Sequence, residues 1–272
     1  MHPHLKKILE TGQMTDSKGQ IHKLSSGISI EEGLFIQEII KEIKPKNSLE
    51  VGFAQGISTM FICEIFQEIN AYKHITIDPF QLETIDSGHN WSGLGLYNIQ
   101  QCGYNEIIDF KNELSEIILP KLLEQGLKID FALIDGNHTF DQALLDFFYI
   151  NRMLNIGGVV VFDDASMKSI NKVINYIRNY PSYVPFQIKK QIIRTNNQYK
   201  YSLSNIQYKL IKNPKIISNL IIRYSKRILS PINDFYTKNF LGLKKNIIIL
   251  NNYYALQKIS DDRRSWSWYR QF

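Results

Sequence analysis

The chain contains 272 residues, of which 44% are hydrophobic and 21% are charged. This composition is that of an ordinary soluble globular protein, and the length allows one large domain or two modest ones around a substantial core. No apolar run approaches the length that crosses a bilayer, and residues 1–14 lack the apolar stretch of a signal peptide, so the sequence predicts a cytoplasmic protein.

The net charge of +6 is unevenly distributed along the chain. Residues 205–245 carry nine Lys or Arg side chains against Asp234 alone, so the rest of the chain is slightly acidic. A basic segment with apolar residues can contact an anionic membrane or an acidic partner, or it can pack against its own domain or a second subunit of a homo-oligomer. Both interpretations stay open, and no nucleic acid is expected as a partner.

The first predicted elements are a helix, a strand and a second helix. Residues 1–30 are mixed and polar and are interpreted as an arm or lid. Residues 30–43 predict a helix because apolar positions recur at helical spacing, acids occupy the first turn, and Pro45 follows the end. A strand is predicted at 47–52 and a helix at 57–69.

Two glycines, Gly52 and Gly56, separate this strand from the helix that follows. Glycines let a ligand lie against bare main chain, and the helix N-terminus offers unpaired N–H groups, so the turn suits a nucleotide-like cofactor. Ile57 excludes a P-loop, and Ala54 excludes the three-glycine dinucleotide motif. The pattern E-x-G-x-x-x-G-x-S, from Glu50 to Ser58, resembles the first motif of class I S-adenosylmethionine-dependent methyltransferases. The alternative is a glycine turn that ends an ordinary core strand.

The next two strands end near polar residues that suit a nucleoside. The strand predicted at 74–77 ends at Asp78, where an open parallel sheet places an acid that accepts hydrogen bonds from ribose hydroxyls. A turn or helix-cap acid is the alternative interpretation of Asp78. A helical pattern at 91–103 and a predicted strand at 106–111 follow. Ser115 comes just after this strand, where a side chain could form a hydrogen bond with the edge of an adenine base.

The middle of the chain alternates regularly between helix and strand patterns. Helices are predicted at 115–125 and 140–153, and strands at 129–134 and 159–162. This alternation predicts an α/β fold with a doubly wound, mostly parallel sheet. Further patterns predict a helix at 170–180 and strands at 184–193, 199–203 and 252–259. The basic segment between the last two strands contains helix-like patterns.

Three acids follow two of these strands. Asp135 follows one strand, and Asp163 and Asp164 follow the next, so the three carboxylates are expected to converge at one edge of the sheet. Like charges so close repel, and a divalent cation that prefers oxygen ligands is the economical explanation. His138 could take a proton from a hydroxyl group activated by that cation. In the alternative interpretation His138 caps the next helix or binds one carboxylate.

Four runs together resemble successive motifs of one class I methyltransferase family, which contains catechol-type enzymes and macrolide-sugar O-methyltransferases of the macrocin type. The runs are Ile77–Phe80, Phe131–Phe140, Gly157–Asp164 and Asp261–Trp266. The resemblance covers roughly residues 27–193 and 251–272 and implies a seven-stranded Rossmann-like sheet whose last strand, at 252–259, is antiparallel. We therefore expect a methyltransferase domain at 31–204 and 249–272, interrupted by a basic helical insertion at 205–248.

The resemblance also implies roles for individual residues. The cofactor would be S-adenosyl-L-methionine, bound by Glu50, Gly52, Gly56, Ser58, Asp78, Ser115 and Asp135. A divalent metal, with Mg²⁺ preferred, would be held by Asp135, Asp163 and Asp164. Some relatives carry Glu at the position of Asp163. His138 would be the catalytic general base.

The expected function is therefore metal-assisted O-methylation of a hydroxyl group on a small-molecule or carbohydrate acceptor. The alternative is a methyltransferase-like binding protein whose basic insertion contacts an anionic membrane or an acidic partner. A third interpretation, an NAD-linked dehydrogenase, is disfavoured by the missing third glycine and by the acidic cluster.

Overall fold

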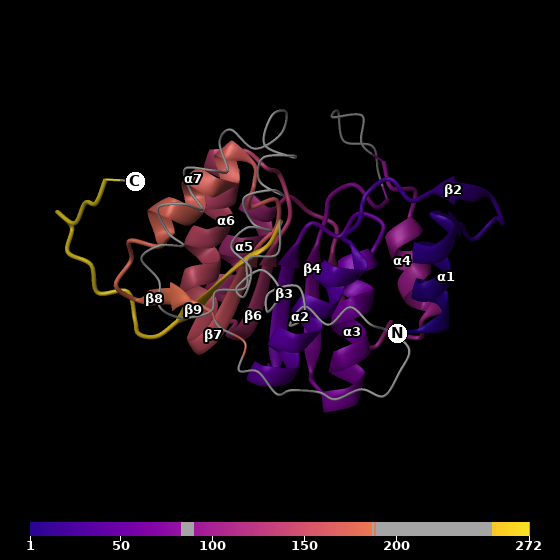
Figure 1. The fold of residues 1–272 in the computed structure, drawn as a ribbon, viewed down its shortest axis with the longest axis horizontal. Coiled ribbons are helices and arrows are strands. Elements are labelled where there is room, and N and C mark those ends of the chain that lie inside the picture. The colour runs from indigo at the N-terminus through magenta and orange to yellow at the C-terminus, as the bar shows by residue number, and fades with distance from the viewer. Residues whose placement is uncertain (83–89, 187, 189–251, 272) are drawn as a thin grey trace, which may run out of the picture. The chain divides into compact units, whose positions relative to one another are not determined.

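The computed structural model describes residues 1–82, 90–186, 188 and 252–271, which belong to one compact unit (Figure 1). The insertion predicted at 205–248 and the strand predicted at 199–203 lie outside the described residues. The membrane, acidic-partner and homo-oligomer contacts proposed for the insertion therefore stay predictions. Among the described helices, none combines the length and the apolar character that a membrane span requires.

The described residues form a seven-stranded sheet in the order β5-β4-β3-β6-β7-β9-β8. Strands β3 to β7 run parallel, and β9 is antiparallel to both β7 and β8. The predicted doubly wound α/β fold and its antiparallel last strand are confirmed. The strands are β3 (Asn47–Val51), β4 (Lys73–Ile77), β5 (Ile108–Lys111), β6 (Ile129–Ile134), β7 (Leu154–Phe162), β8 (Tyr183–Pro185) and β9 (Tyr254–Lys258).

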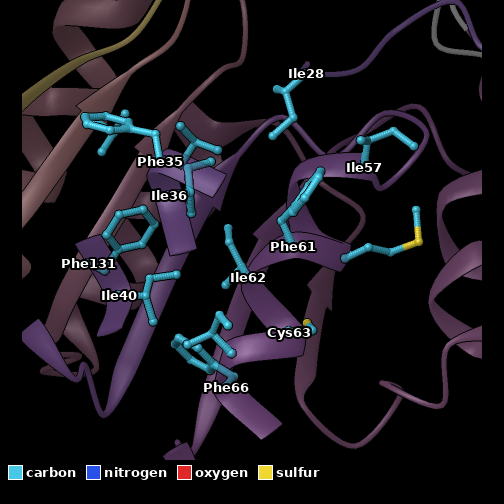
Figure 2. Close-up of a cluster of buried hydrophobic side chains, with 14 of the residues drawn as sticks. Ile28, Phe35, Ile36, Ile40, Ile57, Phe61, Ile62, Cys63, Phe66 and Phe131 are labelled. Carbon is cyan, nitrogen blue, oxygen red and sulfur yellow. The ribbon is translucent and has the colours of Figure 1, made fainter. Parts of the chain in front are cut away.

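Helices cover both faces of this sheet, and alternate strand residues point to each face. In β6, Phe131 and Leu133 join a core cluster with α2 (Ile30–Ile43), α3 (Ile57–Ile69) and α4 (Leu94–Gln101). Figure 2 draws Phe131 in this cluster together with Ile36 and Ile40 of α2. Ala132 and Ile134 join the opposite cluster with α5 (Ser115–Glu124), α6 (Phe140–Met153) and α7 (Lys168–Ile177). Burial on both faces explains why β6 is almost continuously apolar.

Capping explains why the predicted bounds of α2 hold. Ser29 Oγ accepts a hydrogen bond from the Glu32 backbone N (3.2 Å), and Glu32 Oε2 accepts one from the Ser29 backbone N (2.8 Å). This reciprocal capping box satisfies two N–H groups at the helix start. The helix ends at Ile43, and the C-cap residue Lys44 has a φ of 48°, in the left-handed region. The predicted bounds of α3, β6 and α6 are likewise those observed.

Other elements differ from their prediction at their ends. Helix α4 spans 94–101 rather than 91–103, β5 begins at Ile108, and β7 begins at Leu154 rather than at Val159. The segment interpreted as a polar arm contains helix α1 (Pro3–Thr11) and a hairpin of β1 (Gln13–Thr15) and β2 (Ile21–Lys23). Leu5 and Ile8 of α1 are buried in the core. Two buried positions in a nine-residue helix are too few for a clear periodic signal.

Candidate active site

A cavity of about 600 Å³ lies at the carboxyl ends of β3, β4 and β6. This volume is within the range of small-molecule binding pockets, and the carboxyl edge is where open α/β sheets bind ligands. The structure brings six of the predicted site residues together in its lining: Gly52, Ser58, Asp78, Ser115, Asp135 and His138. Glu50, Gly56, Asp163 and Asp164 are not among the described residues that line it.

Backbone hydrogen bonds align the residues that follow the central strands. The Gly52 N donates to Ile77 O (2.9 Å), the Asp135 N to Val51 O (2.9 Å), and the Asp163 N to Ile134 O (3.0 Å). Each strand thus continues its ladder by one residue before the chain turns away. The predicted site residues at these positions are therefore carried by the rigid edge of the sheet.

The turn after β3 requires glycine at Gly52 for two reasons. Its φ is 95°, and a Cβ at this position would overlap the backbone carbonyl of Asp135. Gly56 also has a positive φ, 79°, but it is the N-cap residue of α3, and a Cβ there would lie 3.2 Å from the Gly95 carbonyl oxygen. Gly52 thus brings bare main chain to the cavity, whereas Gly56 allows close packing against α4.

Asp78 holds the glycine turn in place. Its Oδ2 accepts hydrogen bonds from the backbone N of Phe53 (3.1 Å) and of Ala54 (2.7 Å), and its Oδ1 accepts one from Phe80 N (2.8 Å). A carboxylate offers about four acceptor sites, so three amide donors leave one for a ligand hydroxyl. Asp78 can therefore both fix the turn and accept a hydrogen bond from a ribose.

The same turn is tied to the N-terminal segment. Gln55 Oε1 accepts hydrogen bonds from the backbone N of Ser25 (2.9 Å) and Ser26 (3.0 Å), and Gln55 Nε2 donates to Lys23 O (3.2 Å). Ser26, together with the two residues after it, lines the cavity. The N-terminal segment consequently forms one wall of the site, and the sequence pattern did not reveal Gln55.

Glu50 lies inside the fold rather than at the cavity. Its side chain is fully buried, Thr59 Oγ1 donates a hydrogen bond to its Oε1, and its Oε2 lies 3.5 Å from His74 Nε2. His74 Nδ1 in turn lies 2.7 Å from Ser48 Oγ. These contacts tie β3 to the start of α3 and to β4, and the role of Glu50 in cofactor binding stays a prediction.

Ser115 belongs to a hydrogen-bonded group that the sequence analysis missed. Its hydroxyl donates to Asp146 Oδ1 (2.7 Å), and Gln142 Nε2 donates to Ser115 Oγ (3.0 Å). Burial raises the pKa of Asp146 to about 6, although the hydrogen bonds from Ser115 and Gln142 act in the opposite direction. Gln142 lines the cavity, and its position one turn before Asp146 on α6 is the only sequence signal that relates the two.

The acidic residues at the ends of β6 and β7 form a second group. Burial and the neighbouring Asp163 raise the pKa of Asp135, and burial raises the pKa of Asp163 to about 6. The Asp164 backbone N donates to Asp163 Oδ1 (2.6 Å). His138 Nε2 lies 3.4 Å from Asp164 Oδ2 and 4.0 Å from Asp135 Oδ1. Asn252, absent from the predicted set, donates to Asp164 Oδ1 (2.9 Å).

The donor chemistry of this acidic group fits a divalent cation. All its donors are oxygens, and within the described ranges no Lys or Arg forms an ion pair with Asp135, Asp163 or Asp164. The same ranges contain no group of three His, Cys, Asp or Glu side chains already arranged to hold a metal. The carboxylates would therefore have to turn toward one point to share an ion.

Comparison with known proteins agrees with this fold. Residues 49–165 match the family model of a methyltransferase domain. Tapetum-specific methyltransferase 1 of Arabidopsis thaliana is 26% identical over 57% of this chain and 64% of its own length. A caffeoyl-CoA O-methyltransferase of Populus kitakamiensis is 25% identical over 60% of this chain and 64% of its length. The chain thus spans slightly less than two thirds of these curated relatives.

Solved structures show the same fold. The O-methyltransferase from Bacillus cereus in complex with SAH has a TM-score of 0.52 and 15% identity, over 68% of this chain and 83% of that one. TomG from Streptomyces achromogenes in complex with SAM has a TM-score of 0.52 and 14% identity, over 68% and 82%.

The strand order and the matched domain define a Rossmann-like methyltransferase fold. Residues 49–165 are thus similar to methyltransferase domains, and the relatives that the chain resembles include caffeoyl-CoA O-methyltransferases.

Proposed function

We propose that the protein transfers the methyl group of S-adenosylmethionine to a hydroxyl group of a small-molecule or carbohydrate acceptor. The observation that supports this most strongly is that a single cavity is lined by the glycine turn, Asp78 and Ser115 and also by Asp135 and His138. The first three suit a nucleoside cofactor, and the last two suit a group that must lose a proton.

The cofactor would lie along the carboxyl edge of the sheet. Gly52 would let the methionine portion approach the main chain, and Asp78 would accept a hydrogen bond from a ribose hydroxyl. The base would then lie toward β5, because β5 is the neighbour of β4 on the side away from β3. Ser115 follows β5 and lines the cavity there.

In the transfer step, the acceptor oxygen forms a bond to the methyl carbon while the carbon–sulfur bond breaks and its electron pair stays on sulfur. The sulfonium is already an activated electrophile, so the chain must align the acceptor and accept its proton. His138 would accept that proton at Nε2, and the carboxylate of Asp164, 3.4 Å from this nitrogen, would stabilise the imidazolium that forms.

A divalent cation is part of this proposal. Asp135, Asp163 and Asp164 would hold it, with Asn252 beside them, and when bound it would lower the pKa of an acceptor hydroxyl that it contacts. The acidic group would then lose much of its mutual repulsion. His138 and the alignment of the acceptor do not depend on which ion is used.

A methyl-transfer screen tests the function. The full chain would be incubated with methyl-labelled S-adenosylmethionine and panels of sugar, phenolic and lipid-linked hydroxyl acceptors, each with Mg²⁺ and with chelator. We expect label in at least one hydroxyl acceptor, and more of it with Mg²⁺. Binding of S-adenosylhomocysteine without transfer to any acceptor would instead favour a binding protein, and salt-sensitive binding to anionic vesicles would then support the basic segment as its interaction surface.

A further inference from the structure

Asp146 is a buried carboxylate that lies behind the cavity wall rather than in it. It is fully buried on α6, and its Oδ1 accepts the Ser115 hydroxyl at 2.7 Å and lies 3.5 Å from Gln142 Nε2. Within the described part of the chain its Oδ2 has no hydrogen-bond partner. Leaving a buried carboxylate oxygen unpaired is costly, so packing alone does not account for an acid at this position.

The direction of each hydrogen bond around Ser115 follows from its partners. An ionised carboxylate can only accept, so the single hydroxyl hydrogen of Ser115 points to Asp146. Gln142 Nε2 lies close to Ser115 Oγ, Glu116 Oε2 (3.2 Å) and Asp146 Oδ1, all of which are acceptors beside it. The amide nitrogen of Gln142, rather than its amide oxygen, therefore faces these three acceptors. Its hydrogen bond to Ser115 Oγ uses one lone pair of that oxygen.

One lone pair of the Ser115 oxygen is left, and Ser115 lines the cavity. With its hydrogen held by Asp146, Ser115 can offer the cavity an acceptor but no donor. A ligand group that approaches Ser115 must consequently carry a hydrogen to donate. The 6-amino group of adenine meets this requirement, whereas the 6-carbonyl of hypoxanthine would place an acceptor against an acceptor.

Resting on the proposed function, we propose that Asp146 is a positioning residue that fixes Ser115 as an acceptor and thereby makes the cavity select an adenine over a hypoxanthine base. Asp146 acts through Ser115 and does not itself touch the ligand. Gln142 assists because it blocks the second lone pair, so that only one direction remains for the ligand. The difference in affinity between the two bases comes mainly from the hypoxanthine complex. There the Ser115 oxygen and the 6-carbonyl oxygen face each other as two acceptors without a donor, which is costly.

The test compares binding of S-adenosylhomocysteine and S-inosylhomocysteine to the full chain by calorimetry. We expect wild-type protein to prefer the adenine compound by at least about tenfold, the scale of one unpaired buried polar group. In Asp146→Leu the Ser115 hydroxyl is free to donate, so this ratio should fall toward one. A merely structural role would weaken both ligands alike and leave the ratio unchanged.

Further variants keep the test decisive. Asp146→Asn preserves size, and its amide nitrogen can donate to Ser115, so it should lower the ratio in the same direction even if Asp146→Leu does not fold. Combining Ser115→Ala with Asp146→Asn should give the ratio of Ser115→Ala alone, because Asp146 acts through Ser115. Asp141→Asn, at an exposed position on the same helix, is the matched control and should keep the wild-type ratio.

The possible results distinguish a failure of the role proposed for Asp146 from a failure of the methyltransferase function on which it rests. Wild-type protein that binds both compounds equally, or folded Asp146 variants that keep the wild-type ratio, would overturn the role of Asp146 and leave the methyltransferase proposal standing. Wild-type protein that binds neither compound would overturn both.

Discussion

Gly52 lies directly against the backbone carbonyl of Asp135, so closely that a Cβ at Gly52 would overlap it. This contact joins the turn after β3 to the end of β6, two neighbouring strands of the sheet. The glycine proposed to admit the cofactor and the acid at the proposed reaction centre thus share one backbone contact.

The first prediction concerns this contact. Gly52→Ala should destabilise the protein by more than the roughly 1–3 kcal/mol that an unfavourable backbone conformation costs, because the overlap with Asp135 adds to it. Binding of S-adenosylhomocysteine should fall as well. Gly126→Ala is the matched control, since Gly126 has a φ of 76° but open space around its Cβ position. Equal losses of unfolding free energy in urea for both variants would show that the contact is unimportant.

Asp78 should matter for both structure and binding. Asp78→Ala leaves the backbone N–H groups of Phe53, Ala54 and Phe80 without their acceptor, which should cost roughly 1–3 kcal/mol or more in unfolding free energy. Calorimetry should show S-adenosylhomocysteine affinity reduced by at least about tenfold. Asp109→Ala, which removes a partly exposed ion pair with Lys111, should change either quantity little. Unchanged affinity in Asp78→Ala would exclude it from the cofactor site.

The raised pKa of Asp146 predicts a pH dependence of stability. The folded pKa of Asp146, about 6, lies above the ordinary value of 3.8. Between these two pH values the Asp146 carboxyl is therefore mostly protonated in the folded state and mostly ionised in the unfolded state. The contribution of Asp146 to stability should therefore be fully present below about pH 4 and be lost as the pH rises to about 6, a loss of up to about 3 kcal/mol. Asp146→Asn removes this contribution, so the wild type should lose stability relative to the variant over that window. Parallel curves from urea unfolding at pH 4 to 7.5 would contradict the assignment.

Removing one charge from the acidic group should test the cation. Asp164→Asn keeps size, and Asn tolerates the positive φ of 48° at this position about as well as Asp. Mg²⁺ affinity and methyl transfer should therefore fall together while S-adenosylhomocysteine binding survives. Asp261→Asn, an exposed acid in the C-terminal segment, serves as the control. Full activity of chelator-treated wild-type protein would show that the cation is not required.

Much of the fold could be predicted because its elements carry strong local signals. Continuous burial in β6 and capped periodic patterns in α2 and α6 placed their bounds correctly. The carboxyl ends of parallel strands meet at one edge, which is why Gly52, Asp78 and Asp135 could be placed together. Helix α1 was missed because its buried residues are few.

The remaining site residues depend on contacts between distant segments. Glu50 matches a motif letter, but its side chain is buried beside Thr59 and is not part of the cavity lining. Asp146 and Gln55 act through hydrogen bonds to residues about 30 positions away in the chain. No local pattern contains that information, so these residues appear only once the fold is known.

The most direct test of the central claim is single-turnover methyl transfer from labelled S-adenosylmethionine, measured for wild type, His138→Ala and the control His22→Ala, whose histidine pairs with Asp16 in the N-terminal segment. We predict that wild type and His22→Ala methylate a hydroxyl acceptor at the same rate, and that His138→Ala binds the cofactor normally but transfers the methyl group about a hundredfold more slowly. Wild-type speed in His138→Ala when chemistry limits the rate, or no transfer by wild-type protein that binds the cofactor, would contradict the account.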